Sequence, residues 1–461
     1  MLLLAASPTP LVEPLRPPRT ADRSPRHVRP HGPATVLALL ASAALLLPSV
    51  LPRDPMVQAV LLVVVALSTY GLTRLVAAGG ERVRGQRAAP WPTAARCVLG
   101  ALTAAVLVIA AVVGLLGQRV LADVVRVTPP DGWTQAVSVL GALGVARAIL
   151  ALFDRVRRTR VRRGVAAVVL VALTLSSGVL LTRFAGVDPH VKGHQFLAST
   201  PRAEDIGAVT GRPARTPVRV YVGLDDAPTA RARADLAVRE LRRTGALTRS
   251  LLVVAIPTGT GWVNPSSAAA VEYLHDGDTA IVVQQYAAAS SFLAYVQGTD
   301  AASDSARDLL DAVGRELRVR RRAGLPVPTL VVTGESLGAI GGLTALAGRG
   351  DVHGLWVGVP AQVHDRVGQG QTTLVHDTDP VAAWSPGLLW RPTPTWPHPW
   401  VPLVSFVQAT GDLVGAARTP FGYGHKYSRE YLAGWERVVP GPTPLPGAVR
   451  ARVEAVLDAV R

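Results

Sequence analysis

Long apolar stretches fill most of the first 185 residues of the chain. Each is close to the ~20 residues that a helix needs to cross the ~30 Å hydrocarbon core of a bilayer. Core helices of a soluble protein would need a polar face, which these stretches lack. We therefore expect a transmembrane domain of about five helices at residues 34–184, after a basic cytoplasmic tail at residues 1–33. The five stretches are Ala34–Leu51, Met56–Ala78, Ala95–Gly117, Trp133–Phe153 and Gly164–Thr182.

The pattern changes after a polar linker, which we place at residues 185–216. Short runs rich in Val, Ile and Leu then recur, and continuous apolar runs are typical of strands buried on both faces. Amphipathic segments between them, Ala230–Thr244 and Ser303–Arg322, predict helices. This alternation predicts an α/β domain at residues 217–461, built on a mostly parallel, doubly wound sheet. The predicted strands are Val218–Leu224, Leu251–Pro257, Thr279–Tyr286, Thr329–Gly334, Gly354–Pro360, Thr372–Asp377 and Pro402–Gln408.

The net charge of +16 is concentrated beside the apolar stretches. Residues 1–188 hold 21 Lys and Arg against 8 Asp and Glu, whereas residues 189–461 hold 27 against 24. Arginines are concentrated in the tail and in the second and fourth loops. Loops rich in basic residues usually lie on the cytoplasmic side of a membrane. We expect a multi-pass protein of the cell membrane, with its N-terminus inside and its α/β domain on the extracytoplasmic side. The partner that this charge indicates is the lipid bilayer, not a nucleic acid.

Residues for metal or cofactor binding are scarce. The single cysteine, Cys97, lies in an apolar stretch, which excludes an intramolecular disulfide and a cysteine-based metal site. A glycine-rich loop follows the second predicted strand, but it lacks the Gly-Lys-Ser/Thr ending of a phosphate-binding loop. We expect neither a cofactor nor a metal.

A nucleophile motif follows the fourth predicted strand. Thr329–Gly342 reads TLVVTGESLGAIGG, which is a buried strand, then Gly-Glu-Ser-Leu-Gly, then small residues entering a helix. This is the G-x-S-x-G elbow in the strand, turn and helix context of α/β-hydrolases, and it makes Ser336 the candidate nucleophile. Glycines are needed there because larger side chains would collide with the neighbouring strand and helix.

A serine hydroxyl needs a base and an orienting acid, which in this fold follow in the order Ser, acid, His. Asp379 is our candidate acid, because an Asp-Pro turn just past a strand end suits a rigid acid-bearing loop. Asp377 and, after the last predicted strand, Asp412 are the alternatives. His425, in a Gly-rich loop after that strand, is the candidate base.

Two backbone N–H groups should form the oxyanion hole. One is that of Leu337, directly after the nucleophile, and the other belongs to the loop after the second predicted strand. Thr258 or Gly259 supplies it in our prediction.

Taken together, several motifs resemble the membrane-anchored α/β-hydrolases of actinobacteria, sometimes called α/β-hydrolase family nine. That family pairs a multi-helix membrane domain with this catalytic domain, and the resemblance implies Ser336, Asp379 and His425 as the triad. Family members carry a longer insertion where this chain has only residues 361–371, so we expect a more open cleft or a different substrate choice. The motifs lie at Pro217–Ala227, Leu236–Leu247, Pro257–Pro265, Glu272–Tyr286, Gly334–Gly338, Asp379–Trp384 and Gly422–Tyr427.

These features predict a membrane-anchored serine hydrolase that cleaves an acyl ester of a lipid or envelope component. An acyltransferase that uses the same acyl-enzyme is one alternative. A non-catalytic scaffold protein with this fold is another, and a transporter lacks the usual intramembrane carboxylates. Four of nine tryptophans lie in Asp379–Trp400, beside the predicted acid. We expect them either to line an acyl channel or to pack a Pro-rich loop.

Overall fold

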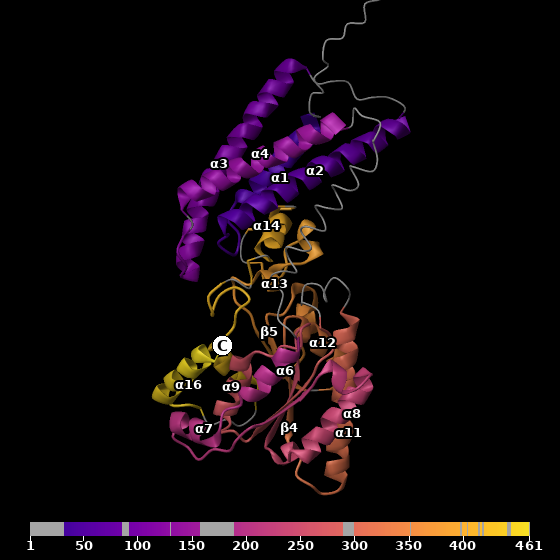
Figure 1. Cartoon of the computed structure of the whole chain (residues 1–461), viewed down its shortest axis with the longest axis vertical. Helices are drawn as coiled ribbons and strands as arrows, with labels where there is room; N and C mark the ends of the chain where they lie inside the picture. Colours follow the sequence, from indigo (N-terminus) through magenta and orange to yellow (C-terminus); the bar gives the residue numbers. More distant parts are fainter. Residues whose placement is uncertain are drawn as a thin grey trace, which may run out of the picture.

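The computed structural model contains a bundle of apolar helices followed by an α/β domain (Figure 1). It describes residues 32–84, 92–129, 131–156, 189–288, 299–350, 352–396, 399–402, 404–413, 415–416, 419–439 and 444–460.

Four helices form the described part of the bundle: α1 (Gly32–Leu46), α2 (Pro55–Arg84), α3 (Thr93–Val125) and α4 (Gly132–Val156). Within the described ranges, three stretches are long and apolar enough to cross a membrane, namely Pro55–Ala77, Thr93–Val125 and Gly132–Ala151. The surface of these helices carries large apolar side chains, such as Leu75 and Leu140, that are about 70% exposed. That surface is typical of helices whose surroundings are lipid.

The first predicted crossing is shorter than the sequence suggests. α1 has 15 residues, or about 22 Å at 1.5 Å per residue, and it ends at Leu46 before Pro48. A helix usually ends before a proline because the residue preceding it disfavours the helical conformation. The fifth predicted stretch, Gly164–Thr182, lies outside the described residues, so the expected number of five helices is not tested.

The α/β domain is built on six parallel strands in the order β1-β3-β2-β4-β5-β6. All six follow predicted runs, and the predicted parallel sheet is confirmed. The strands are β1 (Val218–Val222), β2 (Leu251–Ile256), β3 (Thr279–Gln284), β4 (Thr329–Glu335), β5 (His353–Val357) and β6 (Gln371–Leu374).

Helices cover both faces of this sheet, as the doubly wound pattern predicts. One apolar core lies under α8 (Ala230–Arg243), α11 (Asp300–Arg322) and α12 (Leu337–Leu346). The other lies under α9 (Pro265–Leu274), α15 (Glu430–Val438) and α16 (Gly447–Ala459). Two short helices, α6 (Pro189–Ala198) and α7 (Ala203–Thr210), precede β1.

The seventh predicted strand is wrong. Residues predicted as the strand Pro402–Gln408 belong largely to a helix, α14 (Val404–Leu413). Its buried polar residues Ser405, Gln408 and Asp412 recur every three or four positions, which places them on one helical face. A short apolar run does not by itself distinguish a strand from a helix. Here that polar face packs toward the helical bundle.

The segment after β6 lies between the two domains (Figure 1). It holds α13 (Pro380–Ala383), a 3₁₀ turn at Pro386–Leu389, and α14, which packs against α1. The short segment after β5, where family members carry a longer insertion, forms only a 3₁₀ turn at Ala361–Arg366. What covers the carboxyl edge of the sheet is therefore the later segment, together with the helical bundle above it.

Candidate active site

The turn after β4 holds Ser336 in an unusual backbone conformation. Its φ of 56° and ψ of −115° lie where residues other than glycine are rarely found, and α12 begins at the next residue. The surrounding fold holds this strain, because Ser336 N donates to the carbonyl of Val357 on β5 at 2.9 Å. A strained residue between a buried strand and a helix is characteristic of a nucleophile elbow. The predicted elbow is present at Ser336.

Gly338 allows the elbow to pack closely against β2. A side chain at this position would begin 2.2 Å from the carbonyl oxygen of Ile256 and 3.0 Å from that of Pro257. The start of α12 is thereby held against the loop that follows β2. Leu337 is the first residue of α12, and N–H groups at a helix start have no partner within the helix. Both halves of the predicted oxyanion hole are therefore neighbours.

The loop after β2 is held by one hydrogen bond from β1 and by two hydrogen bonds within the loop itself. Tyr221 Oη donates to the carbonyl of Gly261 at 2.9 Å, and Gly261 N donates to Thr258 O. The N–H of Thr258 itself donates to the carbonyl of Trp262 at 3.0 Å. Of the two predicted donors in this loop, Thr258 is therefore already engaged, which favours Gly259.

Asp379 and His425 form a hydrogen-bonded pair. His425 Nδ1 lies 2.7 Å from Asp379 Oδ2, and the Asp379 side chain is fully buried. Asp379 caps α13, with its Oδ1 accepting from Val381 N at 2.9 Å and Pro380 at the first helical position. If Nδ1–H donates to the carboxylate, Nε2 is left free to accept a proton.

The alternative acids lie elsewhere. Asp377 is exposed to solvent, although it is only two residues from Asp379. Asp412 is buried on α14, where its carboxylate accepts from Arg53 and from Val50 N. Of the three predicted candidates, Asp379 alone is paired with His425 in the described residues.

A tyrosine supports this pair. Tyr427 Oη donates to Asp379 Oδ2 at 2.6 Å, and its side chain is fully buried. Its ring stacks on that of His376 at 4.1 Å. Burial, followed by the nearby Asp379 charge, keeps the pKa of Tyr427 well above its usual range. It therefore remains a hydrogen-bond donor to the carboxylate.

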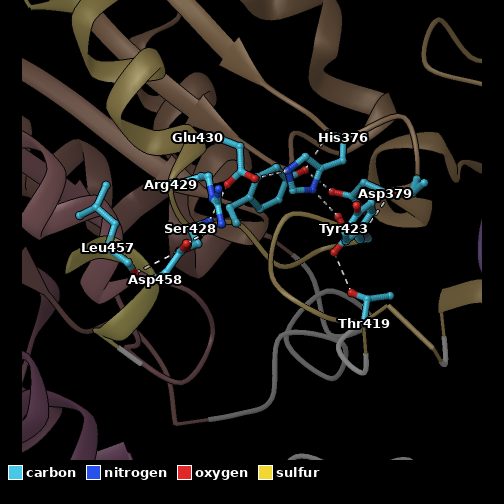
Figure 2. Close-up of polar contacts among 12 residues, drawn as sticks. His376, Asp379, Thr419, Tyr423, Ser428, Arg429, Glu430, Leu457 and Asp458 are labelled. Carbon is cyan, nitrogen blue, oxygen red and sulfur yellow. Dashed lines mark hydrogen bonds and ion pairs between the residues drawn. The ribbon is translucent and has the colours of Figure 1, made fainter. Parts of the chain in front are cut away.

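The loop that carries His425 is tied to the loop that carries Asp379. Gly424 N donates to Thr378 Oγ1 at 2.8 Å, and His376 Nδ1 lies 3.0 Å from the Gly424 carbonyl. Figure 2 shows His376 and Asp379 beside this loop, with Thr419 Oγ1 donating to Tyr423 O at 2.7 Å. These contacts fix the backbone immediately before His425.

Both Ser336 and His425 contact the end of β5. Ser336 N is bonded to Val357, and a side chain at Gly358 would begin 2.5 Å from His425 Cε1. Gly358 also has a φ of 53°, so the position favours glycine on two grounds. The three predicted residues thus converge at the carboxyl edge of the sheet.

Glu335, within the elbow motif, adds a second carboxylate. Asn264 Nδ2 donates to Glu335 Oε2 at 3.3 Å, and Tyr431 Oη donates to the same oxygen. Burial raises the pKa of Glu335, while the charge of His425 acts in the opposite direction. For His425, burial lowers the pKa, but Asp379 and Glu335 outweigh it, so the pKa is raised above its ordinary value of 6.5.

Sequence reasoning missed four of these supporting groups: Tyr427, Glu335, Tyr431 and Gly358. Two of them lie inside motifs that were already recognised, Glu335 in the elbow and Tyr427 two residues after His425. Tyr431 and Gly358 gave no comparable local signal, since only the fold brings them to Glu335 and His425.

Two family models match different parts of the chain. The profile described as "Alpha/beta-hydrolase family" matches residues 218–372 and 367–450, together just over half of the chain. The profile described as "Alpha/beta-hydrolase family N-terminus" matches residues 46–188. No curated protein sequence matches the chain.

A solved structure also matches weakly. It is the cutinase of Trichoderma reesei in complex with a C11Y4 phosphonate inhibitor, at 11% identity and a TM-score of 0.24. The match covers 41% of this chain and 85% of that chain. So slight a likeness bears neither on activity nor on substrate.

Proposed function

The chain belongs to the α/β-hydrolase family, and we propose that it is a membrane-anchored serine hydrolase that cleaves an acyl ester. The observation that carries this proposal is the buried Asp379–His425 pair, 2.7 Å apart, beside the strained elbow at Ser336. In this mechanism Ser336 attacks the acyl carbon while His425 Nε2 takes its proton. His425 then returns the proton to the leaving alcohol, and Asp379 stabilises the imidazolium between the two steps.

The acyl-enzyme is then hydrolysed by the same groups. Water loses a proton to His425 and attacks the ester on Ser336, which releases the acid and restores the serine hydroxyl. Negative charge on the carbonyl oxygen is stabilised by the N–H groups of Leu337 and Gly259. The helix dipole of α12 favours that charge as well.

We further propose that the helical domain spans the cell membrane and leaves the catalytic domain outside. The first and third loops of the bundle both lie at the end that faces the catalytic domain, where Val50 and Leu51 pack with Val125. Arginines are abundant in the tail and in the second and fourth loops instead. The positive-inside rule therefore assigns the catalytic domain to the extracytoplasmic side.

One labelling experiment tests activity and sidedness. A fluorophosphonate probe with a charged, membrane-impermeant tag should label the protein in intact cells, because such probes react only with an activated serine. Ser336→Ala should remove the label. If the wild-type protein is silent even in opened membranes, it is a non-catalytic scaffold. Labelling of opened membranes alone would instead place the catalytic domain in the cytoplasm.

Of the four tryptophans after Asp379, one, Trp390, favours a lipid substrate. Trp384 and Trp400 donate from Nε1 to Thr410 and to the carbonyl of Leu388, each at 2.9 Å, and Trp396 is buried against α14. Those three rings pack the segment. Trp390, in contrast, is 65% exposed, and amphipathic rings of this kind favour a membrane–water boundary.

We therefore expect Trp390→Ala to slow the turnover of long-chain esters in vesicles by about 3- to 10-fold, as ~1 kcal/mol of lost apolar contact implies. Turnover of soluble acetate or butyrate esters should not change. Trp396→Ala is the contrasting variant, since it should destabilise the segment and affect both substrates. Equal losses for long and short esters in Trp390→Ala would reject the lipid contact.

A further inference from the structure

A buried ion pair joins the helical domain to the catalytic domain. Arg53, in the loop between α1 and α2, donates from Nε to Asp412 Oδ1 on α14 at 2.7 Å. The two side chains are 2% and 0% exposed, so water does not screen the pair. Burying two charges is costly unless their other polar atoms also find partners.

Those partners are present on both sides. Arg53 donates from Nη2 to Ser49 Oγ at 2.7 Å and to the carbonyl of Gln408 at 3.0 Å. Asp412 Oδ2 accepts from Val50 N at 2.9 Å. The guanidinium thus holds the α1–α2 loop and α14 in one arrangement. An apolar contact would join two domains with less geometric restriction, because it is non-directional.

A second contact reaches the loop of the catalytic base. Tyr423, two residues before His425, packs against an apolar cluster of Val50, Leu51 and Val125. These three belong to the α1–α2 loop and to the end of α3. The helical domain therefore touches the base loop directly, in addition to its ion pair with α14.

The two contacts hold the ends of one short segment. α14 ends at Leu413, one residue after Asp412, and the carbonyl of Ala416 accepts from His425 N at 3.3 Å. A displacement of α14 or of Tyr423 would therefore move the backbone that carries the imidazole. A shift of about 1 Å in a catalytic group can slow a reaction by about 100-fold.

We propose that the helical domain positions the catalytic base, with Arg53 as a positioning residue that acts through Asp412 and the α14–His425 segment. This inference rests on the serine-hydrolase function proposed above. It assigns the helical domain a part in catalysis beyond anchoring, since packing between the domains sets the position of His425 relative to Ser336.

The test uses the full-length chain in lipid nanodiscs. For folded Arg53→Met, kcat for a soluble butyrate ester and the rate of fluorophosphonate labelling of Ser336 should both fall by about 10- to 100-fold. KM should stay within about twofold, because the soluble ester does not contact Arg53. Arg53→Lys should recover part of the loss, since it retains a charge opposite Asp412 but not the planar fork.

A matched control separates positioning from general stability. Arg219 and Glu272 form an equally buried pair, 1% and 0% exposed, on β1 and α9. By strand register Arg219 lies level with Val331, five residues before Ser336. Arg219→Met should lower the thermal midpoint, whereas its folded fraction should label at the wild-type rate.

Three results would overturn the inference. These are wild-type labelling of folded Arg53→Met, equal losses in Arg53→Met and Arg219→Met, and a change confined to KM. If Arg53→Met does not fold, Tyr423→Ala offers the same test without an unpaired buried charge, and Tyr423→Phe should keep the wild-type rate. A wild-type chain that does not label would contradict the proposed function instead.

Discussion

Replacing His425 by Ala should abolish ester turnover, with kcat/KM falling on the order of 1,000-fold or more, and Ser336→Ala should cost at least as much. Without the imidazole, no group in contact with Asp379 removes the proton from the serine hydroxyl. The two losses should not add in the double variant, because base and nucleophile act in a single step. Turnover of a soluble nitrophenyl ester by folded, full-length protein measures all three variants.

The pH profile of the wild-type enzyme checks the role of His425 independently. Asp379 and Glu335 raise the pKa of this imidazole above 6.5, and only the neutral form accepts a proton. As pH falls through the raised pKa, the base becomes protonated and kcat/KM should fall, with a midpoint above 6.5. Glu335→Gln should move that midpoint to lower pH, because it removes a neighbouring negative charge. A midpoint that does not move would exclude Glu335 as an electrostatic partner.

Asp379→Asn should lower kcat by about 10,000-fold while leaving the fold intact. The amide is nearly the same size as the carboxylate, but it can donate a hydrogen bond to Nδ1. The imidazole would then carry its proton on Nε2, where a lone pair is needed to accept the proton of Ser336. Asp379 is buried and accepts a hydrogen bond from Tyr427, so bulk solvent does not reach this position.

Asp377→Asn is the matched control for this prediction. It makes the same chemical change two residues away, on a side chain that is exposed to solvent. Its turnover should stay within about twofold of wild type, as is usual for surface substitutions. A severe loss in Asp377→Asn combined with a mild loss in Asp379→Asn would assign the acid to the other aspartate.

The sequence by itself determined the parts of this protein that depend on local pattern. Six of seven apolar runs became the predicted strands, because continuous burial on both faces leaves a strong signal in short segments. The elbow at Ser336 could be predicted equally well, since the turn requires small residues at fixed positions. The order of strands along the chain also placed Asp379 at the carboxyl edge of the sheet, after β6. His425 was predicted to follow a seventh strand, and in the structure it follows the helix α14 instead.

Tertiary structure decided what depends on contacts between distant residues. Residues 402–408 suit a strand or a helix equally well. As a helix, α14 places Gln408 and Asp412 on one face against the α1–α2 loop. Asp377 and Asp379 are the same residue type, two positions apart in the sequence. Only Asp379 is buried beside His425 and Tyr427.

Arg53 and Asp412 are 359 residues apart, so no local pattern could pair them. From the sequence, Arg53 was one loop charge among many, and Asp412 was a third candidate for the catalytic acid. Packing of the helical domain against the catalytic domain removes both from water, and a buried charge requires a partner of the opposite sign. The fold thereby joins the helical domain to the catalytic domain through these two residues.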